Sequence, residues 1–270
     1  MKSEWKSSLI WLLSLAVACS ALQTILAERS HVSFLKENTV ETWEFRQQHL
    51  PTGLFDQITE IEGADRNFSE ILTVTMLEGE FFPRFISTDS SLYRKYKPEE
   101  YDLLKKAYQA IWEDVDCFPV PSEDIFYEDT FGEERLYGGE RVHEGTDLSG
   151  KVKKSGYYPV LSMTDGTIEK MGWLPLGGYR VGIRSPHGGY FYYAHLSEYE
   201  KNINEGDKVL AGDILGYMGN TGYGEPGTTG KFPVHLHLGI YILSSDGKEL
   251  SVNPYWILNS VKKKTRNYRY

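Results

Sequence analysis

The sequence predicts a mainly β domain with an antiparallel sheet, preceded by an α-helical N-terminal region. From about residue 127 onward, short runs rich in β-branched and aromatic residues are broken by glycines, as in YYPVLSM, GGYRVGIRS and HLHLGIYIL. Many short strands at such spacing favour an antiparallel sandwich or barrel. Gly188 and Gly189 join two of these runs as a tight hairpin turn does. Between residues 28 and 125, by contrast, apolar residues recur at helical spacing.

Two segments carry the helical prediction. FSEILTVTML, residues 68–77, places its apolar side chains on one helical face. In residues 97–115, Pro98 stands near the start, Glu99 and Glu100 follow in the first turn, and an apolar stripe runs from Tyr101 to Trp112. The stripe is more typical of a packing surface than of a ligand site. We expect residues 28–125 to form a stalk or prodomain beside the β domain.

The first 27 residues have the pattern of an export signal. Lys2 and Lys6 precede an apolar run over residues 9–27, and Glu28 and Arg29 follow it. A basic start followed by an apolar stretch is typical of such signals, and the run is close to the roughly 20 residues needed to span a bilayer. Residues 1–27 are therefore predicted to be a cleaved signal peptide or a membrane anchor, with the rest of the protein outside the cytoplasm.

Composition and charge narrow the class of protein. The chain has 270 residues and a formal net charge of −9, which argues against a nucleic-acid partner. Residues 259–270 form a basic tail that we expect to be solvated, with contact to anionic wall polymer or lipid as the alternative. Cys19 and Cys117 are the two cysteines, and their positions imply no disulfide framework. Lipid modification of Cys19 is open, although Ala16 stands where such a signal normally carries Leu.

The segment HEGTD places two potential metal ligands close together in the chain. His143 and Asp147 are four residues apart, but Gly145, Gly150 and β-branched Thr146 disfavour a helix that would put them on one face. In a straight strand four residues span roughly 13 Å, too far for both side chains to reach one ion. We therefore expect the segment to curl at Gly145. The His143 nitrogen and Asp147 oxygen are both ordinary zinc ligands.

Further histidines end or interrupt apolar strands. In VHLHLGIYI, strand alternation puts His235 and His237 on one face and Leu236 and Leu238 on the other. Two imidazoles on one strand face among apolar neighbours indicate a functional role, since a solvated polar face fits this context less well. One of them can complete a metal site while the other stands beside it unligated. His195 ends a third segment, the aromatic run YFYYAHL.

Together these motifs resemble a known family. HxxxD, YAHL and HLH, in this order and at this spacing, resemble the LytM/lysostaphin-type zinc endopeptidases of peptidoglycan, peptidase family M23. The stretches GDKVLAGDILG and GNTG look like the same family, and the resemblance covers roughly residues 131–255. Any one of these motifs is weak, whereas the combination is specific. GEPGTTGKFP, residues 224–233, is a longer loop before HLH than the shortest relatives have, which puts substrate fit in doubt and leaves the metal site unaffected.

The resemblance implies a fold, a metal site and a substrate. It implies an antiparallel sheet with an open groove, of the LytM (duplicated hybrid motif) type, over residues 126–258. It implies one Zn²⁺ per catalytic domain, bound by His143, Asp147 and His237. It further implies an exported bacterial hydrolase, a metalloprotease acting on peptidoglycan stem or cross-bridge peptides of the cell wall, with a membrane contact if the N-terminal segment is retained.

The resemblance also implies catalytic residues beyond the metal ligands. His195 and His235 match the family's two unligated histidines, with His235 interpreted as the general base and His195 as an orienting group, although the reverse fits the sequence equally well. Tyr137 is the nearest candidate for a tyrosine whose hydroxyl faces the reacting carbonyl. Glu144 is an alternative base by analogy with HExxH peptidases. The second histidine of that motif is absent here, so a surface or supporting role fits Glu144 better.

Three other interpretations remain to be weighed. A catalytically silent LytM-like scaffold, or an activator of other wall hydrolases, is disfavoured because all five family positions are filled. A biotinyl- or lipoyl-type carrier is suggested by GDKVLAGDILG alone and lacks the hairpin lysine that such a carrier modifies. A third hypothesis, that the helical region blocks the groove until it is removed, rests on the size and position of that region alone. The scissile bond, a glycyl-glycine bridge or a link involving D-amino acids, stays open.

Overall fold

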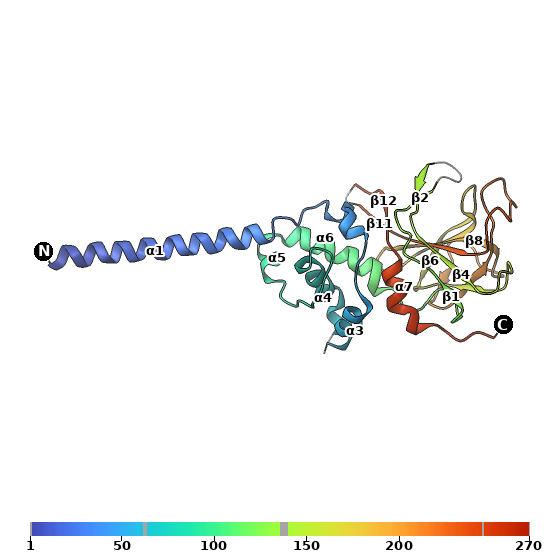
Figure 1. Ribbon diagram of the computed structural model, residues 1–270, viewed down its shortest axis with the longest axis horizontal. Helices are drawn as coiled ribbons and strands as arrows, with labels where there is room; N and C mark the ends of the chain where they lie inside the picture. The colour runs from blue at the N-terminus through green and yellow to red at the C-terminus, as the bar shows by residue number, and fades with distance from the viewer. Residues whose placement is uncertain (1, 62–63, 136–139, 245, 270) are drawn as a thin grey trace.

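The computed structural model describes residues 2–61, 64–135, 140–244 and 246–269. Figure 1 shows a long N-terminal helix that projects from a cluster of helices, and beyond that cluster a β-rich part that carries the C-terminus. The predicted order, helical region first and antiparallel sheet second, is confirmed.

The projecting helix is α1 (Lys2–His31). By length and composition, Ser8–His31 could cross a membrane, and the apolar window within it is not buried by other parts of the protein. The helix continues past residue 27, and its end contacts the helical region. Glu28 accepts hydrogen bonds from Lys95 (2.8 Å) and Tyr96 (2.7 Å), and His31 Nε2 lies 3.0 Å from Glu78. The anchor-like segment and the folded part are thus continuous.

The helical region packs around aromatic side chains. Its helices are α2 (Trp43–Arg46), α3 (Thr52–Glu60), α4 (Ala64–Glu78), α5 (Ser91–Tyr96) and α6 (Pro98–Tyr108), with a π-helical turn over Gln109–Glu113. Pro98 occupies the first turn of α6, where its missing N–H is no loss. Tyr101, Leu104, Tyr108 and Trp112 are buried, so the predicted stripe is a packing surface.

The β-rich part is built on one large antiparallel sheet. Its main path runs β1-β4-β11-β8-β7-β6-β9; β12 pairs with β11, and β10 pairs with β8 and β5. The strands are β1 (Ile125–Phe126), β4 (Thr146–Gly150), β5 (Pro159–Leu161), β6 (Gly166–Leu174), β7 (Gly178–Arg184), β8 (Tyr190–Tyr199), β9 (Lys208–Val209), β10 (Ile214–Met218), β11 (Leu236–Leu243) and β12 (Glu249–Val252). A separate hairpin pairs β2 (Glu134–Arg135) with β3 (Arg141–Val142). The sheet is followed by α7 (Tyr255–Val261) and a 3₁₀ turn over Lys262–Lys264.

The strand register brings the predicted motifs to one place. β11 lies between β4 and β8, so His237 faces Asp147 on one side and Ala194 on the other. Leu236 and Leu238 are fully buried on the opposite face of β11, which confirms the predicted alternation. The predicted hairpin at Gly188 and Gly189 joins β7 to β8.

The helical region and the sheet share one hydrophobic core. Buried side chains form a continuous cluster from Val32 in the helical region to Val261 in α7. Polar contacts join the two parts as well: Arg46 donates to the carbonyl and hydroxyl oxygens of Ser251, at 2.7 Å each, and the Asn253 amide donates to the Arg46 carbonyl. The division of the chain near residue 125 stays a prediction. Part of the basic tail is docked, because Arg266 donates to the Ala211 carbonyl at 2.8 Å.

Candidate metal centre

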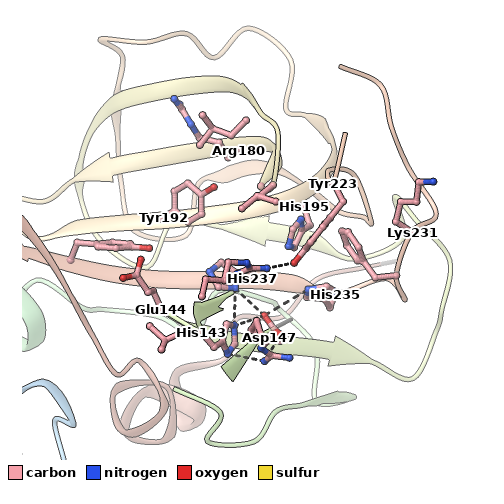
Figure 2. Close-up of a pocket in the computed structure, with 18 of the residues that line it drawn as sticks. His143, Glu144, Asp147, Arg180, Tyr192, His195, Tyr223, Lys231, His235 and His237 are labelled. Atoms are coloured by element: carbon pink, nitrogen blue, oxygen red, sulfur yellow. Dashed lines mark hydrogen bonds and ion pairs between the residues drawn. The ribbon is translucent and has the colours of Figure 1, made fainter. Parts of the chain in front are cut away.

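Two imidazoles and one carboxylate converge at the register point of β4 and β11. His143 Nε2 lies 3.1 Å from Asp147 Oδ1 and 3.1 Å from His237 Nδ1, and His237 Nδ1 lies 2.9 Å from Asp147 Oδ1. These ligand atoms all lie within 4.8 Å of one another, and Figure 2 shows the three side chains pointing toward one another. One ion can therefore contact all three residues.

The chain at Gly145 makes this convergence possible. His143 and Glu144 lie outside regular structure, the chain bends at Gly145, and β4 begins at Thr146, so the segment is not a straight strand. A Cβ atom on Gly145 would lie 2.4 Å from the Leu238 carbonyl oxygen and 2.7 Å from His237 Cε1. The glycine is thus required by the close approach of β11. This sharpens the expected curl, because the missing side chain makes room for the ring of His237.

The far side of the His143 ring is also held. Its Nδ1 lies 3.1 Å from the carbonyl oxygen of Thr130 and 3.0 Å from the Thr130 hydroxyl. A carbonyl oxygen can only accept, so when Nε2 gives its lone pair to a cation, Nδ1 carries the proton and donates it to Thr130. Arg135 Nη2 is 2.9 Å from the same nitrogen and 3.4 Å from Asp147 Oδ2. With Nδ1 protonated, Arg135 contacts that atom without donating to it and faces the second carboxylate oxygen.

The electrostatics of the three side chains fit a cation. Although burial disfavours the charged carboxylate, the imidazoles of His143 and His237 hold the pKa of Asp147 well below its usual range. Burial lowers the pKa of His237, against the opposing pull of Asp147. A carboxylate and imidazole lone pairs at this spacing repel one another unless a proton or cation lies between them. The donor set, two nitrogens and one oxygen, suits a borderline metal ion such as Zn²⁺.

His195 and His235 stand beside the three residues. His235 Nδ1 donates to the Pro233 carbonyl at 2.8 Å, and its Nε2 lies 3.7 Å from Asp147 Oδ1. His195 Nδ1 donates to the Thr221 carbonyl at 2.8 Å, and its ring centroid lies 4.8 Å from that of His235. Burial, followed by the nearby imidazoles, lowers the pKa of His195 to about 3, so that its ring is neutral. Each histidine therefore has its tautomer set by a backbone carbonyl, which leaves Nε2 as an acceptor.

These residues open into a cleft of about 1210 Å³. Among the described residues, its lining begins at Glu134, and no part of the helical region contributes to it. Its aromatic lining residues are Tyr190, Tyr192, Tyr223, Phe232 and Tyr241, and its basic ones are Arg135, Arg141, Arg180 and Lys231. Figure 2 places Arg180 and Tyr192 along one wall and Lys231 at the rim. The position of the cleft counts against a helical region that blocks the groove.

Comparison with known proteins decides the family. The family model of Peptidase family M23 matches residues 141–254. The crystal structure of a candidate glycyl-glycine endopeptidase lytM from Ruminococcus gnavus ATCC 29149 is 40% identical, with a TM-score of 0.77, over 89% of this chain and 98% of that chain. The chain belongs to peptidase family M23. Because 89% of the chain is matched, the similarity extends beyond the sheet into the helical region.

Two further relatives match parts of the chain. The L-Ala–D-Glu endopeptidase of Bacillus subtilis (strain 168) is 42% identical over 158 residues, which is 58% of this chain and 47% of that protein. Lysostaphin of Staphylococcus simulans is 40% identical over 84 residues, 30% of this chain and 16% of that protein. This chain thus spans less than half the length of these relatives.

The structure brings together five of the six residues predicted for this M23 site. His143, Asp147, His195, His235 and His237 all line the cleft. Tyr137, the sixth, lies outside the described residues. Glu144 is exposed at the cleft wall. The ligand and catalytic roles of these residues stay predictions.

Some residues of the M23 site were not predicted from the sequence. Thr130 and Arg135 contact His143, yet no sequence pattern connects them with it. Tyr223 accepts a hydrogen bond from Arg141, and its ring is stacked near that of His195, with centroids 6.1 Å apart. The one available signal for Tyr223 was its position directly after the GNTG motif.

Proposed function

We propose that this M23 protein is an exported, zinc-dependent endopeptidase that hydrolyses peptide bonds of bacterial peptidoglycan. The observation that carries the proposal is the convergence of His143, Asp147 and His237 at a cleft whose lining includes two further histidines. A metal site in an open cleft suits a peptide substrate. The relatives named as endopeptidases support peptide hydrolysis as the reaction.

The three converging side chains would hold the ion through His143 Nε2, His237 Nδ1 and an oxygen of Asp147. Three protein ligands are typical of catalytic zinc sites, which keep a further position for water or substrate. Bound Zn²⁺ lowers the pKa of a water molecule and polarises the scissile carbonyl. The protein's part is to fix the ligands: Thr130 orients one imidazole, and Arg135 faces the second oxygen of Asp147.

His235 is proposed as the general base. Its ring lies at the cleft, and its Nε2 acceptor is directed to the carboxylate that would share the metal. The Pro233 carbonyl fixes the ring with Nδ1 protonated, so that Nε2 can take a proton from the attacking water. His195 is deeper, with 7% of its surface exposed, and its ring packs against His235. We assign it the orienting role. Tyr137 stays a prediction for the carbonyl-facing hydroxyl.

The substrate is proposed to be a stem or cross-bridge peptide of peptidoglycan. The names of the relatives state two bonds, L-Ala–D-Glu and glycyl-glycine. The cleft offers aromatic surface at Tyr190, Tyr192 and Tyr241 and positive charge at Arg180 and Lys231, which suits an extended peptide that carries carboxylates.

Export is proposed from α1. Its Ser8–His31 portion is long and apolar enough to cross a membrane, as either a signal peptide or a retained anchor. A retained anchor would hold the enzyme on the outer side of the membrane, where it could reach the cell wall.

Mass spectrometry of peptides released from defined peptidoglycans tests the proposed reaction. Wild type is expected to release peptides from walls with L-Ala–D-Glu stems or with glycine bridges, and His237→Ala is expected to release none. Release that persists in His237→Ala would overturn the metal assignment. Bound zinc without any release by the wild type would favour the silent scaffold instead.

A further inference from the structure

The segment 129–133, which we call the support loop, lies between the helical region and the metal centre. We propose that Trp43 of the helical region, acting through Phe131 of the support loop, positions the metal ligand His143. The helical region then supports the metal site from behind the cleft. This inference rests on the proposed function, since it takes His143 to be a metal ligand.

The first step is the contact between Trp43 and the support loop. The rings of Trp43 and Phe131 are stacked, with centroids 5.6 Å apart and planes 20° apart. The next residue, Gly132, has φ of +81°, and a Cβ there would lie 2.2 Å from Trp43 Cη2. The indole therefore packs on both Phe131 and the backbone of Gly132. Phe131 is 7% exposed, so moving Trp43 would uncover it.

The second step is the contact between the support loop and His143. The Gly132 amide donates to the His143 carbonyl and the His143 amide donates to the Glu133 carbonyl, each at 2.8 Å. The Thr130 carbonyl oxygen lies 3.1 Å from His143 Nδ1 and accepts its proton when Nε2 binds the ion. The loop thus fixes the backbone and the ring orientation of His143 together. Carbonyl acceptors on the second nitrogen of a metal-binding histidine set both its tautomer and its direction.

Trp43 is held in place by contacts of α2, the helix that it begins. The Thr42 hydroxyl accepts from the Phe45 amide and caps α2, and Phe45 is fully buried in the core. Arg46, at the other end of α2, is bonded to Ser251 and lies over the Phe131 ring at 5.7 Å. The Asn253 side chain donates to Asp129 at the start of the loop (2.9 Å). Both α2 and the loop are therefore tied to the end of β12.

A substrate-binding role does not account for Trp43. The indole is half exposed, yet it is not among the residues that line the cleft. Its contacts lead to His143 from the side opposite the converging ligand atoms. A positioning role explains both the location of the indole and the absence of room for a side chain at Gly132.

The test measures the dissociation constant for Zn²⁺ in the full-length protein, by competition with a chromogenic chelator. Trp43→Ala is expected to bind Zn²⁺ about 10-fold more weakly, within the roughly 10–100-fold range for losing support of a metal ligand. Trp43→Phe, which keeps a ring on Phe131, is expected to recover most of the affinity. Phe82→Ala is the matched control, because Phe82 is a similarly exposed aromatic of the helical region that packs on His49 instead.

Two further measurements separate positioning from general stability. The absorption spectrum of the Co²⁺-substituted protein reports the ligand geometry, and it is expected to change in Trp43→Ala and stay unchanged in Phe82→Ala. Phe131→Leu keeps an apolar side chain in the loop and is expected to reproduce the weaker binding if Trp43→Ala does not fold.

The outcomes are distinguishable. Wild-type Zn²⁺ affinity and an unchanged Co²⁺ spectrum in Trp43→Ala, or in Phe131→Leu should the first variant not fold, would overturn the inference and leave the proposed function intact. Equal weakening in Phe82→Ala would also overturn it, because the effect would then be general. A wild-type protein that binds no Zn²⁺ would refute the proposed function, and the inference with it.

Discussion

Replacing Gly145 by alanine is the most direct perturbation of the metal centre that leaves every ligand in place. The added Cβ would lie 2.4 Å from the carbonyl oxygen of Leu238, and 2.7 Å and 2.9 Å from Cε1 and Nε2 of His237. Ordinary carbon–oxygen contacts are about 3.3–3.6 Å. The β4 and β11 backbones, or the His237 ring, must therefore shift by about 1 Å.

This shift of about 1 Å determines how strongly Gly145→Ala is expected to weaken zinc binding and slow cleavage. Overpacking a well-packed site typically costs about 1–3 kcal/mol of stability. A ligand or reacting group displaced by about 1 Å can lower the rate by about 100-fold, and disturbed support of a ligand weakens metal binding by roughly 10–100-fold. We expect Gly145→Ala to fold, to bind Zn²⁺ at least about 10-fold more weakly, and to cleave about 100-fold more slowly at saturating zinc.

The assay combines zinc competition with peptide release from purified wall. Gly53→Ala in α3 is the control, because a Cβ there meets no atom within 4 Å and alanine in a helix is about 0.5–1 kcal/mol more favourable than glycine. Wild-type zinc affinity and rate in Gly145→Ala would refute the proposed crowding between residue 145 and His237.

Two further predictions follow from the site and the core. His235→Ala is expected to keep its zinc, because His235 is not one of the three converging ligands. Its rate of peptide release is expected to fall about 10²–10⁴-fold, which is the usual contribution of a general base. Zinc loss on dialysis of this variant, or an unchanged rate, would contradict the assignment of His235 as the base. Tyr108→Phe is expected to leave the free energy of unfolding unchanged or to raise it by about 1 kcal/mol. Among the described residues the buried Tyr108 hydroxyl has no hydrogen-bond partner, and leaving a buried hydroxyl unpaired is unfavourable. A clear drop in the urea midpoint of Tyr108→Phe would show that the hydroxyl is bonded.

Local patterns predicted much of this molecule. The α6 stripe of Tyr101, Leu104 and Tyr108 is a packing face because helical spacing is a property of neighbouring residues. The pairing of His235 and His237 with buried leucines follows from strand alternation in the same way. The ligand set came from a family resemblance in which three separated motifs occur in order.

Contacts between residues far apart in the chain could not be predicted from the sequence. Trp43 and Phe131 are 88 positions apart, and neither lies in a recognisable motif. Thr130 supports His143 through a backbone carbonyl, a group that every residue carries and that no pattern reveals. Gly145 was expected to let the chain curl, whereas its role against His237 depends on strand pairing across 92 positions. Contacts of this kind are set by packing and register, which only the folded chain specifies.

Metal content measured alongside activity tests the central claim most directly. Full-length protein would be stripped with a chelator, dialysed, and titrated with Zn²⁺, while bound metal and peptide release from defined peptidoglycan are followed together. We predict that release is lost on stripping and returns in proportion to bound zinc, reaching its maximum at one ion per chain, and that His237→Ala recovers neither. Release by the stripped protein, or by His237→Ala, would contradict the account.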